Sequence, residues 1–456
     1  MKLLAKHRVS LRVMLIGICA IILVACGSRT DTEEPEITET AIQPTPTQLG
    51  VNQPTPNPSE EAIPEVTSLL LWWPDELAPA GNDVNILLNN QIQAFGDAEG
   101  NLEIDFRLKT MQELGGIMST LRTAIVVAPS TLPDITIIRR EDLISAVTNN
   151  LIQPMSGVAS PSPTIISDLY DIAIELGEYD ADGAGEGTSQ LYGLPYLLDV
   201  THLTYLNDAD NETAINWSFN DILTQNQAFL FPAGQTTGVN RTFWMQYFSA
   251  GGVIPNEANN FEINETALLE TLSFYEQLAE SQLITSNVFT YTSPNDYLEL
   301  MTTGEVSAAV VRTSQYFNLR LSDEAWEIAP IPTSSGGNVA MINAWMWVIV
   351  TPDPERQAIA ARFIDWMMDV QRQQEYAEVI YRLPSQESAL LSMNSDLIDA
   401  NRMSELIESA YLTLPESEGG ILARTMHDAL MRVINGESTA EEATQAVLTI
   451  AENERD

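Results

Sequence analysis

The residue types limit the catalytic chemistry available to this chain. Three histidines and two cysteines are too few for a zinc centre of His and Cys ligands or for a disulfide scaffold. His202 could act with a serine and an aspartate, but no Gly-x-Ser-x-Gly segment supplies the nucleophile turn of such a triad. The histidine lies in an apolar segment, so a buried structural histidine is the simpler interpretation.

The sequence also gives no clear motif for nucleotide hydrolysis, glycoside hydrolysis or calcium binding. No glycine loop of Walker A or dinucleotide type is present, so nucleotide hydrolysis by this chain is not expected. Carboxylates are abundant, but spacing along the sequence cannot reveal the pair that a glycosidase uses. Asp180–Glu186 resembles a calcium loop, yet it lacks a third early oxygen ligand and the glutamate at position 12. These residue types therefore give no support to an enzyme, and we expect no cofactor and no metal.

Short strands alternate with helices in the chain after residue 66. Apolar runs predict buried strands at 67–73 and 133–138, and an alternation of period two predicts a third strand at 102–108. Helical spacing of apolar residues predicts helices at 85–95 and 111–127. Strands and helices that alternate in this way favour a parallel sheet covered on both faces, so the expected fold class is α/β.

The charge balance excludes one class of partner. The chain has 456 residues, with 63 acidic and 21 basic side chains and a formal net charge of −42. Such an acidic surface repels phosphate, so we expect no nucleic acid partner. At roughly 100–200 residues per domain the length suggests two or three domains. A hydrophobic content of 45% excludes wholesale disorder.

The N-terminal residues have the pattern of an export signal followed by a lipid anchor. Basic residues precede an apolar run of 13 residues, Val13–Ala25, which is shorter than the roughly 20 residues that span a bilayer. The run ends in Leu23-Val24-Ala25-Cys26, which resembles the bacterial lipoprotein lipobox. We expect residues 1–25 to be removed as a signal peptide and Cys26 to be lipidated. An ordinary signal peptide with an incidental cysteine is the alternative.

Residues 26–66 have the composition of a tether. Beyond Cys26 this segment is rich in proline, threonine and acidic residues and has almost no large apolar side chains. Burial therefore cannot offset the entropy of ordering it. Proline and like-charge repulsion favour an extended spacer between the lipid and the globular body.

Several landmarks follow one another in a fixed order after residue 67. They include a first strand that ends in tryptophan, a Pro-Asp-apolar strand, a Tyr-Gly-x-Pro-Tyr segment, a helix that ends at Gly-Gly, and a C-terminal pair of helices. The segments are Leu69–Trp72, Pro133–Ile135, Asn150–Met155, Tyr192–Asp199, Trp244–Gly252, Ile331–Gly337, Ala360–Met367, Arg382–Pro384 and Val433–Ala443.

In this order and spacing, residues 67–452 resemble the extracellular solute-binding proteins of ABC importers. The similarity is to the sugar-binding branch that includes maltose-binding protein. It implies a two-lobed periplasmic-binding-protein fold, each lobe a mostly parallel sheet flanked by helices, that closes over a ligand by hinge motion. The expected first lobe is 67–195 with 340–384, and the second is 196–339 with 385–456. The expected hinge lies near Pro195–Asp199.

The resemblance also implies partners and a location. We expect a monomer, anchored on the extracytoplasmic face of the cell membrane through its lipid alone. It would capture a small-molecule ligand, first of all a mono- or oligosaccharide, and deliver it to the transmembrane subunits of an ABC permease. A polyamine, a peptide or another non-sugar solute would suit the same fold. A non-transport lipoprotein, such as a sensor partner or an adhesin, is the third possibility.

Sugar recognition needs aromatic faces for C–H surfaces and fixed polar groups for hydroxyls. On alternation, we expect one tryptophan of the pair 72/73 and one of the pair 345/347 to face the cleft, and we favour Trp73 and Trp345; core packing is the alternative for each. Asp199 is the principal polar candidate because it follows the Tyr-Gly-x-Pro-Tyr segment. Gln315 stands where the family often has a stacking aromatic, so a maltodextrin-type row of rings is not evident. The further candidates are Asp75, Tyr196, Arg241, Trp244, Arg312, Tyr316 and Arg382.

Overall fold

The computed structural model describes most of the chain after residue 65. The chain divides into one unit up to Ile63 and a second unit from Pro64 to Asp456, and every described residue belongs to the second. The predicted signal peptide, Cys26, nearly all of the tether and the acidic loop after Asp180 lie outside the described residues. No helix within the described ranges has the length and apolar character needed to cross a membrane. The described ranges are 66–79, 81–111, 113–180, 189–207, 217–234, 238–253, 262–394, 396–412 and 420–455.

A mixed sheet of nine strands organises the body. Its main path runs β10-β6-β9-β3-β1-β2, while β11 pairs with β9 and both β7 and β8 pair with β6. A separate pair, β4 (Glu178–Tyr179) and β5 (Gln190–Leu191), is antiparallel. The strands of the large sheet are β1 (Ser68–Pro74), β2 (Glu103–Lys109), β3 (Ile135–Arg139), β6 (Leu194–Leu206), β7 (Ala308–Arg312), β8 (Trp326–Ala329), β9 (Ala340–Ile349), β10 (Leu383–Pro384) and β11 (Ala410–Leu412).

The strands and helices predicted at the start of the body are confirmed. β1, β2 and β3 occupy the three predicted strand segments, and β1 pairs in parallel with both of the others. The predicted helices correspond to α1 (Asn82–Ala98) and α2 (Ile117–Val127). β3 lies between β1 and β9 and is buried along nearly its whole length, which explains its continuous apolar sequence. β2 lies at the edge of the sheet, so its sequence alternates.

The Pro-Asp-apolar motif has a structural explanation at Asp134. This carboxylate is nearly buried and accepts a hydrogen bond of 2.7 Å from the backbone N–H of Leu70 on β1. It also accepts one of 2.5 Å from Nε of Arg356, on α11 (Pro354–Met367). The backbone carbonyl of Asp134 accepts the N–H of Val350, directly after β9. One aspartate therefore ties together three neighbouring strands and the helix that packs on them.

Two long strands connect two hydrophobic cores. β6 and β9 pair antiparallel from Leu194 and Trp347 to Thr201 and Met341. Residues of β6 up to Val200 belong to the first core, which also contains β1 and β3, whereas the later part of β6 belongs to the second core. β7 and β8 run antiparallel to β6, whereas β11 pairs in parallel with the start of β9. The sequence led us to expect a mostly parallel sheet in the second lobe, but β7 and β8 both pair antiparallel with β6.

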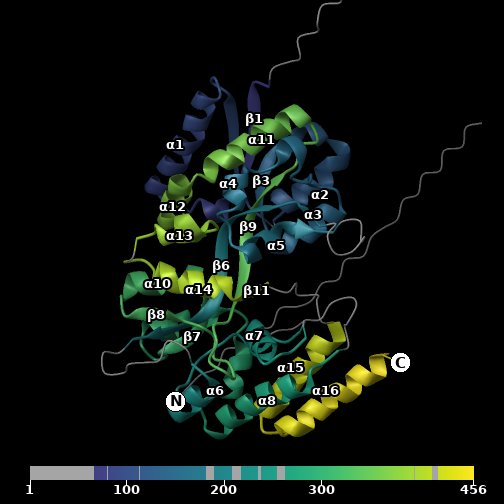
Figure 1. Ribbon diagram of the computed structural model, residues 1–456, viewed down its shortest axis with the longest axis vertical. Coiled ribbons are helices and arrows are strands. Elements are labelled where there is room, and N and C mark those ends of the chain that lie inside the picture. The colour runs from purple at the N-terminus through teal and green to yellow at the C-terminus, as the bar shows by residue number, and fades with distance from the viewer. Residues whose placement is uncertain are drawn as a thin grey trace, which may run out of the picture. The chain divides into compact units, whose positions relative to one another are not determined.

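Helices cover each core separately (Figure 1). α1, α11 and α12 (Val370–Val379) pack on one another beside β1, and α8, α15 and α16 pack together around the second core. Met403, Leu406 and Ile407 of α14 pack into the first core, as do Phe317 and Leu319 of α10. The other helices are α3 (Arg140–Thr148), α4 (Pro163–Ile166), α5 (Asp171–Gly177), α6 (Phe219–Thr224), α7 (Arg241–Ser249), α8 (Glu265–Glu280), α9 (Leu298–Thr302), α10 (Thr313–Ser322), α13 (Glu387–Leu391), α14 (Ala400–Glu408), α15 (Gly420–Ile434) and α16 (Ala440–Arg455).

His202 is a buried residue of β6, as its apolar surroundings in the sequence indicate. Its side chain is fully buried, Nδ1 lies 2.8 Å from the carbonyl oxygen of Leu203, and the ring meets Tyr316 edge-on. No described residue hydrogen-bonds to Nε2. Burial disfavours the charged imidazolium and lowers the pKa of His202 to about 4, although the hydrogen bond to Leu203 opposes this shift.

We predict that His202 makes folding stability depend on pH. Its pKa is lower in the folded chain than the unfolded value of 6.5, so the unfolded chain binds the proton more tightly. Stability is complete above pH 6.5 and falls as the pH drops toward 4, by on the order of 3 kcal/mol. Urea unfolding of wild type and His202→Gln at pH 7 and pH 4.5 should show a smaller loss in the variant. His427→Gln, which changes a half-buried histidine, is the control; equal pH slopes for wild type and His202→Gln would contradict the prediction.

Candidate ligand-binding site

Strand register brings several polar side chains onto one face of the sheet. Asp199 on β6 is the cross-strand partner of Asn343 on β9, and Arg139 on β3 is the partner of Trp345 on β9. Arg312, the last residue of β7, pairs with β6 two residues beyond Asp199. Cross-strand partners, and residues two apart along a strand, share a face of a sheet. We call the following group the crossing site: Arg139, Glu141, Asp199, Arg312, Asn343 and Trp345.

The two arginines occupy the carboxyl ends of their strands. Arg139 ends β3 and Arg312 ends β7, and the pairings through β9 and β6 make these strands run toward each other. The carboxyl ends of strands therefore meet at the crossing site from both cores. In open α/β sheets this is where ligands bind, because the crevice outside the strand ends is left uncovered by helices.

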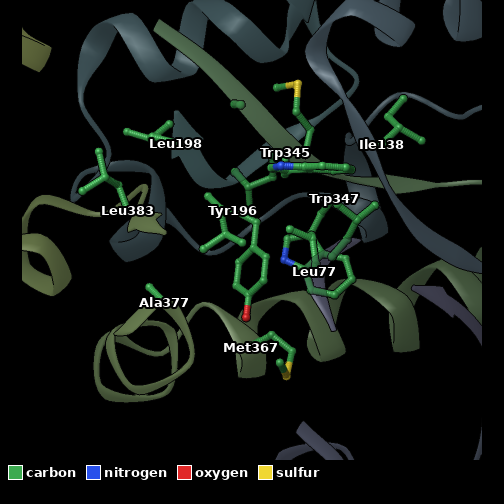
Figure 2. Close-up of a cluster of buried hydrophobic side chains, with 14 of the residues drawn as sticks. Leu77, Ile138, Tyr196, Leu198, Trp345, Trp347, Met367, Ala377 and Leu383 are labelled. Carbon is green, nitrogen blue, oxygen red and sulfur yellow. The ribbon is translucent and has the colours of Figure 1, made fainter. Parts of the chain in front are cut away.

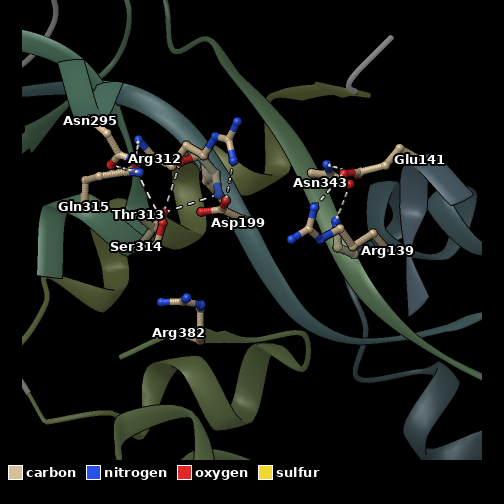
Figure 3. Close-up of polar contacts among 12 residues, drawn as sticks. Arg139, Glu141, Asp199, Asn295, Arg312, Thr313, Ser314, Gln315, Asn343 and Arg382 are labelled. Carbon is tan, nitrogen blue, oxygen red and sulfur yellow. Dashed lines mark hydrogen bonds and ion pairs between the residues drawn. The ribbon is translucent and has the colours of Figure 1, made fainter. Parts of the chain in front are cut away.

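A charged network surrounds Arg139 (Figure 3). Arg139 forms one ion pair with Glu76, just beyond β1, and another with Glu141 at 3.7 Å. Glu141 also accepts a hydrogen bond of 2.9 Å from Nδ2 of Asn343. The guanidinium group of Arg139 lies over the indole of Trp345, 4.9 Å from the ring centroid, a favourable cation–π position. Arg139 thus contacts two carboxylates and the face of one aromatic ring, which lies beside further donors and acceptors.

Arg312 and Asp199 form the other half of the crossing site. Their closest charged atoms are 4.0 Å apart, and the side chains are 44% and 21% exposed. Gln315 accepts the backbone N–H of Arg312 through Oε1 and donates to Oδ1 of Asn295 at 3.2 Å. Thr313 donates through Oγ1 to a β6 carbonyl, which fixes the start of α10 against the crossing strand. Figure 3 shows these side chains grouped on the opposite side of the site from Arg139.

The tryptophans of the predicted set differ in burial according to their position along the strand. Trp345 and Trp347 are two residues apart on β9 and share a face, so alternation cannot decide which of them faces a ligand. Trp347 is fully buried, and its ring centroid lies 5.4 Å from that of Trp73. Trp73 is also fully buried, and its ring packs against those of Phe106, Tyr196 and Tyr376.

Trp345 belongs to the crossing site and is 9% exposed. In Figure 2 its indole lies above Trp347 and Tyr196. The guanidinium group of Arg139 lies over this ring, 4.9 Å from its centroid. Both favoured tryptophans belong to the first core, but Trp345 lies at its edge against Arg139 and stays a ligand-binding candidate, whereas Trp73 is fully buried among aromatic rings.

The buried members of the predicted set contribute to packing. Tyr196 is fully buried in the first core and stacks on Tyr376. Trp244 is buried in the second core against Phe248. Tyr316 is also buried. It lines a cavity of about 410 Å³ that lies between α10, β8 and the segment leading into α14.

The charged members of the predicted set that lie outside the crossing site are more exposed. Asp75 is exposed on the short 3-10 helix Asp75–Leu77, next to the Glu76 that binds Arg139. Arg382 is half-buried, donates to the carbonyl of Tyr381 and stands apart from both polar groups in Figure 3. Arg241 is the first residue of α7 and is half-buried. No group of three or more metal-ligating side chains is found in the described ranges.

Four residues of this network were not selected from the sequence: Arg139, Glu141, Asn343 and Glu76. A signal for Arg139 was present, because it directly follows the apolar run at 133–138, and the residue after a parallel strand lies at the ligand edge of the sheet. The pairing of β3 with β9 is antiparallel and joins segments some 200 residues apart, so no local pattern could indicate that Asn343 meets Glu141.

Comparison with known proteins identifies the family of this chain. The family model described as bacterial extracellular solute-binding protein matches residues 90–401. The chain belongs to this family. The resemblance found in the sequence is thereby confirmed, and members of the family are binding proteins, not enzymes. No curated protein sequence matches the chain.

Solved structures of two-lobed binding proteins are similar to this solute-binding protein in fold. The cyclic α-maltosyl-1,6-maltose binding protein of Arthrobacter globiformis has a TM-score of 0.64 at 13% identity, covering 85% of this chain and 99% of that one. The sugar-binding protein MalE of Xanthomonas citri has a TM-score of 0.64 at 16% identity, with coverage of 85% and 98%. A family 1 extracellular solute-binding protein of Alicyclobacillus acidocaldarius has a TM-score of 0.63 at 17% identity, covering 85% of this chain and 98% of that one. The two-lobed α/β fold is confirmed.

We predict different consequences for the two favoured tryptophans. Trp73→Ala removes a ring that is fully buried among four other aromatic rings, so it should lower the free energy of unfolding by about 3–5 kcal/mol. Trp345→Ala should cost less, because one face of that ring is covered by a guanidinium group and not by packed apolar atoms. Urea unfolding curves of both variants test this. Equal losses, or a larger loss for Trp345→Ala, would contradict the assignment.

Proposed function

We propose that this solute-binding protein captures a sugar at the crossing site and delivers it to an ABC import permease. The observation that carries the proposal is the composition of that site. One indole ring, Trp345, lies beside charged and amide groups that can donate to and accept from hydroxyls: Arg139, Glu141, Asp199, Arg312 and Asn343. Sugars are bound by this combination of an apolar face and oriented polar groups.

The fold neighbours support a sugar as the ligand class. Among the solved structures with this fold, one is titled as a cyclic α-maltosyl-1,6-maltose binding protein and another as a sugar-binding protein. Their identities to this chain are 13% and 16%, so they support the architecture, while the choice of a sugar rests on the residues of the crossing site.

The architecture also supports capture by closure. β6 and β9 belong to both cores, Arg139 comes from the first-core side, and Arg312 ends a strand that pairs with the later part of β6. A ligand between these residues would contact both lobes only when the lobes approach each other, so binding would shift the population toward the closed state. In this proposal the lobes are 67–195 with 340–384, and 196–339 with 385–456.

The alternative ligands fit these residues less well. A polyamine carries several positive charges, and the crossing site presents two arginines together with its three nearby carboxylates, Glu76, Glu141 and Asp199. A site for a polycation would be expected to carry carboxylates without arginines between them. A peptide ligand and a non-transport role remain outcomes that binding experiments would reveal.

We predict that one saccharide will stabilise the purified protein through the crossing site. At about 100 times its dissociation constant, a ligand that binds only the folded chain adds roughly 2.7 kcal/mol to stability. A thermal-shift screen of mono-, di- and oligosaccharides, with polyamines and peptides as comparisons, should therefore give a saturable rise in melting temperature. Asp199→Asn and Trp345→Ala should remove the rise.

The control for this screen is Arg362→Gln. Arg362 binds Glu99 at 2.7 Å on the outside of the first core, and its loss should leave the ligand response intact. A response that survives both crossing-site variants would place the ligand elsewhere. A response to peptides or polyamines alone would overturn the sugar assignment and keep the fold.

We further predict that Cys26 attaches the protein to the membrane, in line with the lipobox-like segment that precedes it. Lipid attachment to a cysteine requires its thiol, so Cys26→Ser should move the exported protein from the membrane fraction to the soluble fraction. Fractionation followed by immunoblotting measures this shift, with the wild type as the reference. A wild-type protein that is soluble, or a Cys26→Ser protein that stays in the membrane fraction, would contradict the anchor.

A further inference from the structure

The pairing of Arg312 with Asp199 differs from that of a matched pair elsewhere in the protein. Arg362 and Glu99 have side-chain exposures of 50% and 25%, close to the 44% and 21% of Arg312 and Asp199. Yet Arg362 makes hydrogen bonds of 2.7–3.1 Å to its partner, whereas Arg312 stays 4.0 Å from Asp199. Exposure therefore does not explain the looser pair. Arg356–Asp134, Arg372–Asp369 and Arg402–Glu405 are also closer pairs than Arg312–Asp199.

Arg312 and Asp199 both have hydrogen-bonding groups that no described residue satisfies. The guanidinium group of Arg312 donates to no described residue, although three acidic residues are present in the chain for each basic one. Asp199 Oδ1 is buried, and no described residue donates to it. Burying a carboxylate oxygen without a donor costs free energy, and that cost would be relieved by a ligand that donates to it. The two side chains thus present one open donor group and one open acceptor atom at the same point of the crossing site.

Three of the few basic residues of this acidic chain are the last residues of strands. β2, β3 and β7 end at Lys109, Arg139 and Arg312, and no other strand of the described residues ends at a charged side chain. Lys109 is also the single lysine of the sequence after residue 6. Its ammonium group lies 4.1 Å from the ring centroid of Trp72. Arg139 is hydrogen-bonded to Glu76 and is 31% exposed, whereas Arg312 is 44% exposed and donates to no described residue, so Arg312 is the cation of the crossing site that is more available to a ligand.

From these observations we infer that the ligand is an acidic sugar. Its carboxylate is bound by the guanidinium of Arg312, and a hydroxyl of the same molecule donates to Oδ1 of Asp199. A carboxylate matches the planar fork of an arginine in a bidentate manner, which a hydroxyl cannot do. A neutral sugar would satisfy Asp199 and leave Arg312 with weaker partners. This inference rests on the proposed capture of a sugar and specifies the chemical class of that sugar.

Matched pairs of sugars test the inference. Calorimetric titration of the purified protein would compare D-glucuronate with D-glucose and D-galacturonate with D-galactose, together with short oligomers of each. The acidic member of one pair should bind at least tenfold more tightly, and raising NaCl from 0.1 M to 0.5 M should reduce that preference. Arg312→Gln should weaken binding of the acid at least tenfold and change affinity for its neutral partner less than threefold.

Two further variants guard against a folding defect. Arg312→Lys keeps the charge and should restore part of the preference for the acid, while Arg362→Gln removes a similarly exposed arginine and should leave the preference unchanged. Tighter binding of the neutral sugars, or a preference for the acid that survives Arg312→Gln, would overturn the acidic ligand and leave sugar capture standing. Binding of no sugar in any pair would overturn both.

Discussion

The antiparallel pairing of β6 with β9 is the constraint on which the rest of the molecule depends. These two strands form part of both hydrophobic cores, and each adds its own neighbours, with β3 on β9 and β7 on β6. Their register fixes which residues face one another where the cores meet. Asp199 opposite Asn343 is a consequence of that register, and Arg139 opposite Trp345 follows from the pairing of β3 with β9. A slip of β6 by one residue would turn Asp199 to the other face of the sheet.

A second constraint is electrostatic. The chain carries 63 acidic side chains and 21 basic ones, so carboxylates compete for few cations. Several arginines serve structure: Arg356 joins Asp134 at the centre of the sheet, and Arg362 fastens α11 to Glu99 at the end of α1. Others end the strands that point at the crossing site. The interior of the sheet and the ligand edge therefore depend on the same small set of residues, and the fold uses arginine where a fixed geometry is needed.

The sequence predicted the parts of this structure that depend on local pattern. Apolar runs and period-two alternation placed β1, β2 and β3, and the order of landmarks indicated the two-lobed architecture. The polar site was predicted only in part. Asp199, Arg312 and Trp345 were among the candidates, but Trp73 and Tyr196, which look similar in the sequence, are fully buried.

What separates these aromatic residues is the position along a strand at which the covering helices end. That position is set by tertiary packing and leaves no period in the sequence. In the same way, Glu76, Glu141 and Asn343 come from three separate segments that only the sheet brings together. A residue at the end of a predicted strand was the one usable signal, and it indicated Arg139.

The central claim is that the ligand is held at the crossing of β6 and β9. A crystal structure of the protein with its best-binding saccharide tests this most directly. The account predicts density for the sugar against Trp345, within hydrogen-bond distance of Asp199 and Arg312, with the two cores closed around it. Density in the cavity lined by Tyr316, Arg320 and Arg402, or on the outer surface of either core, would contradict it.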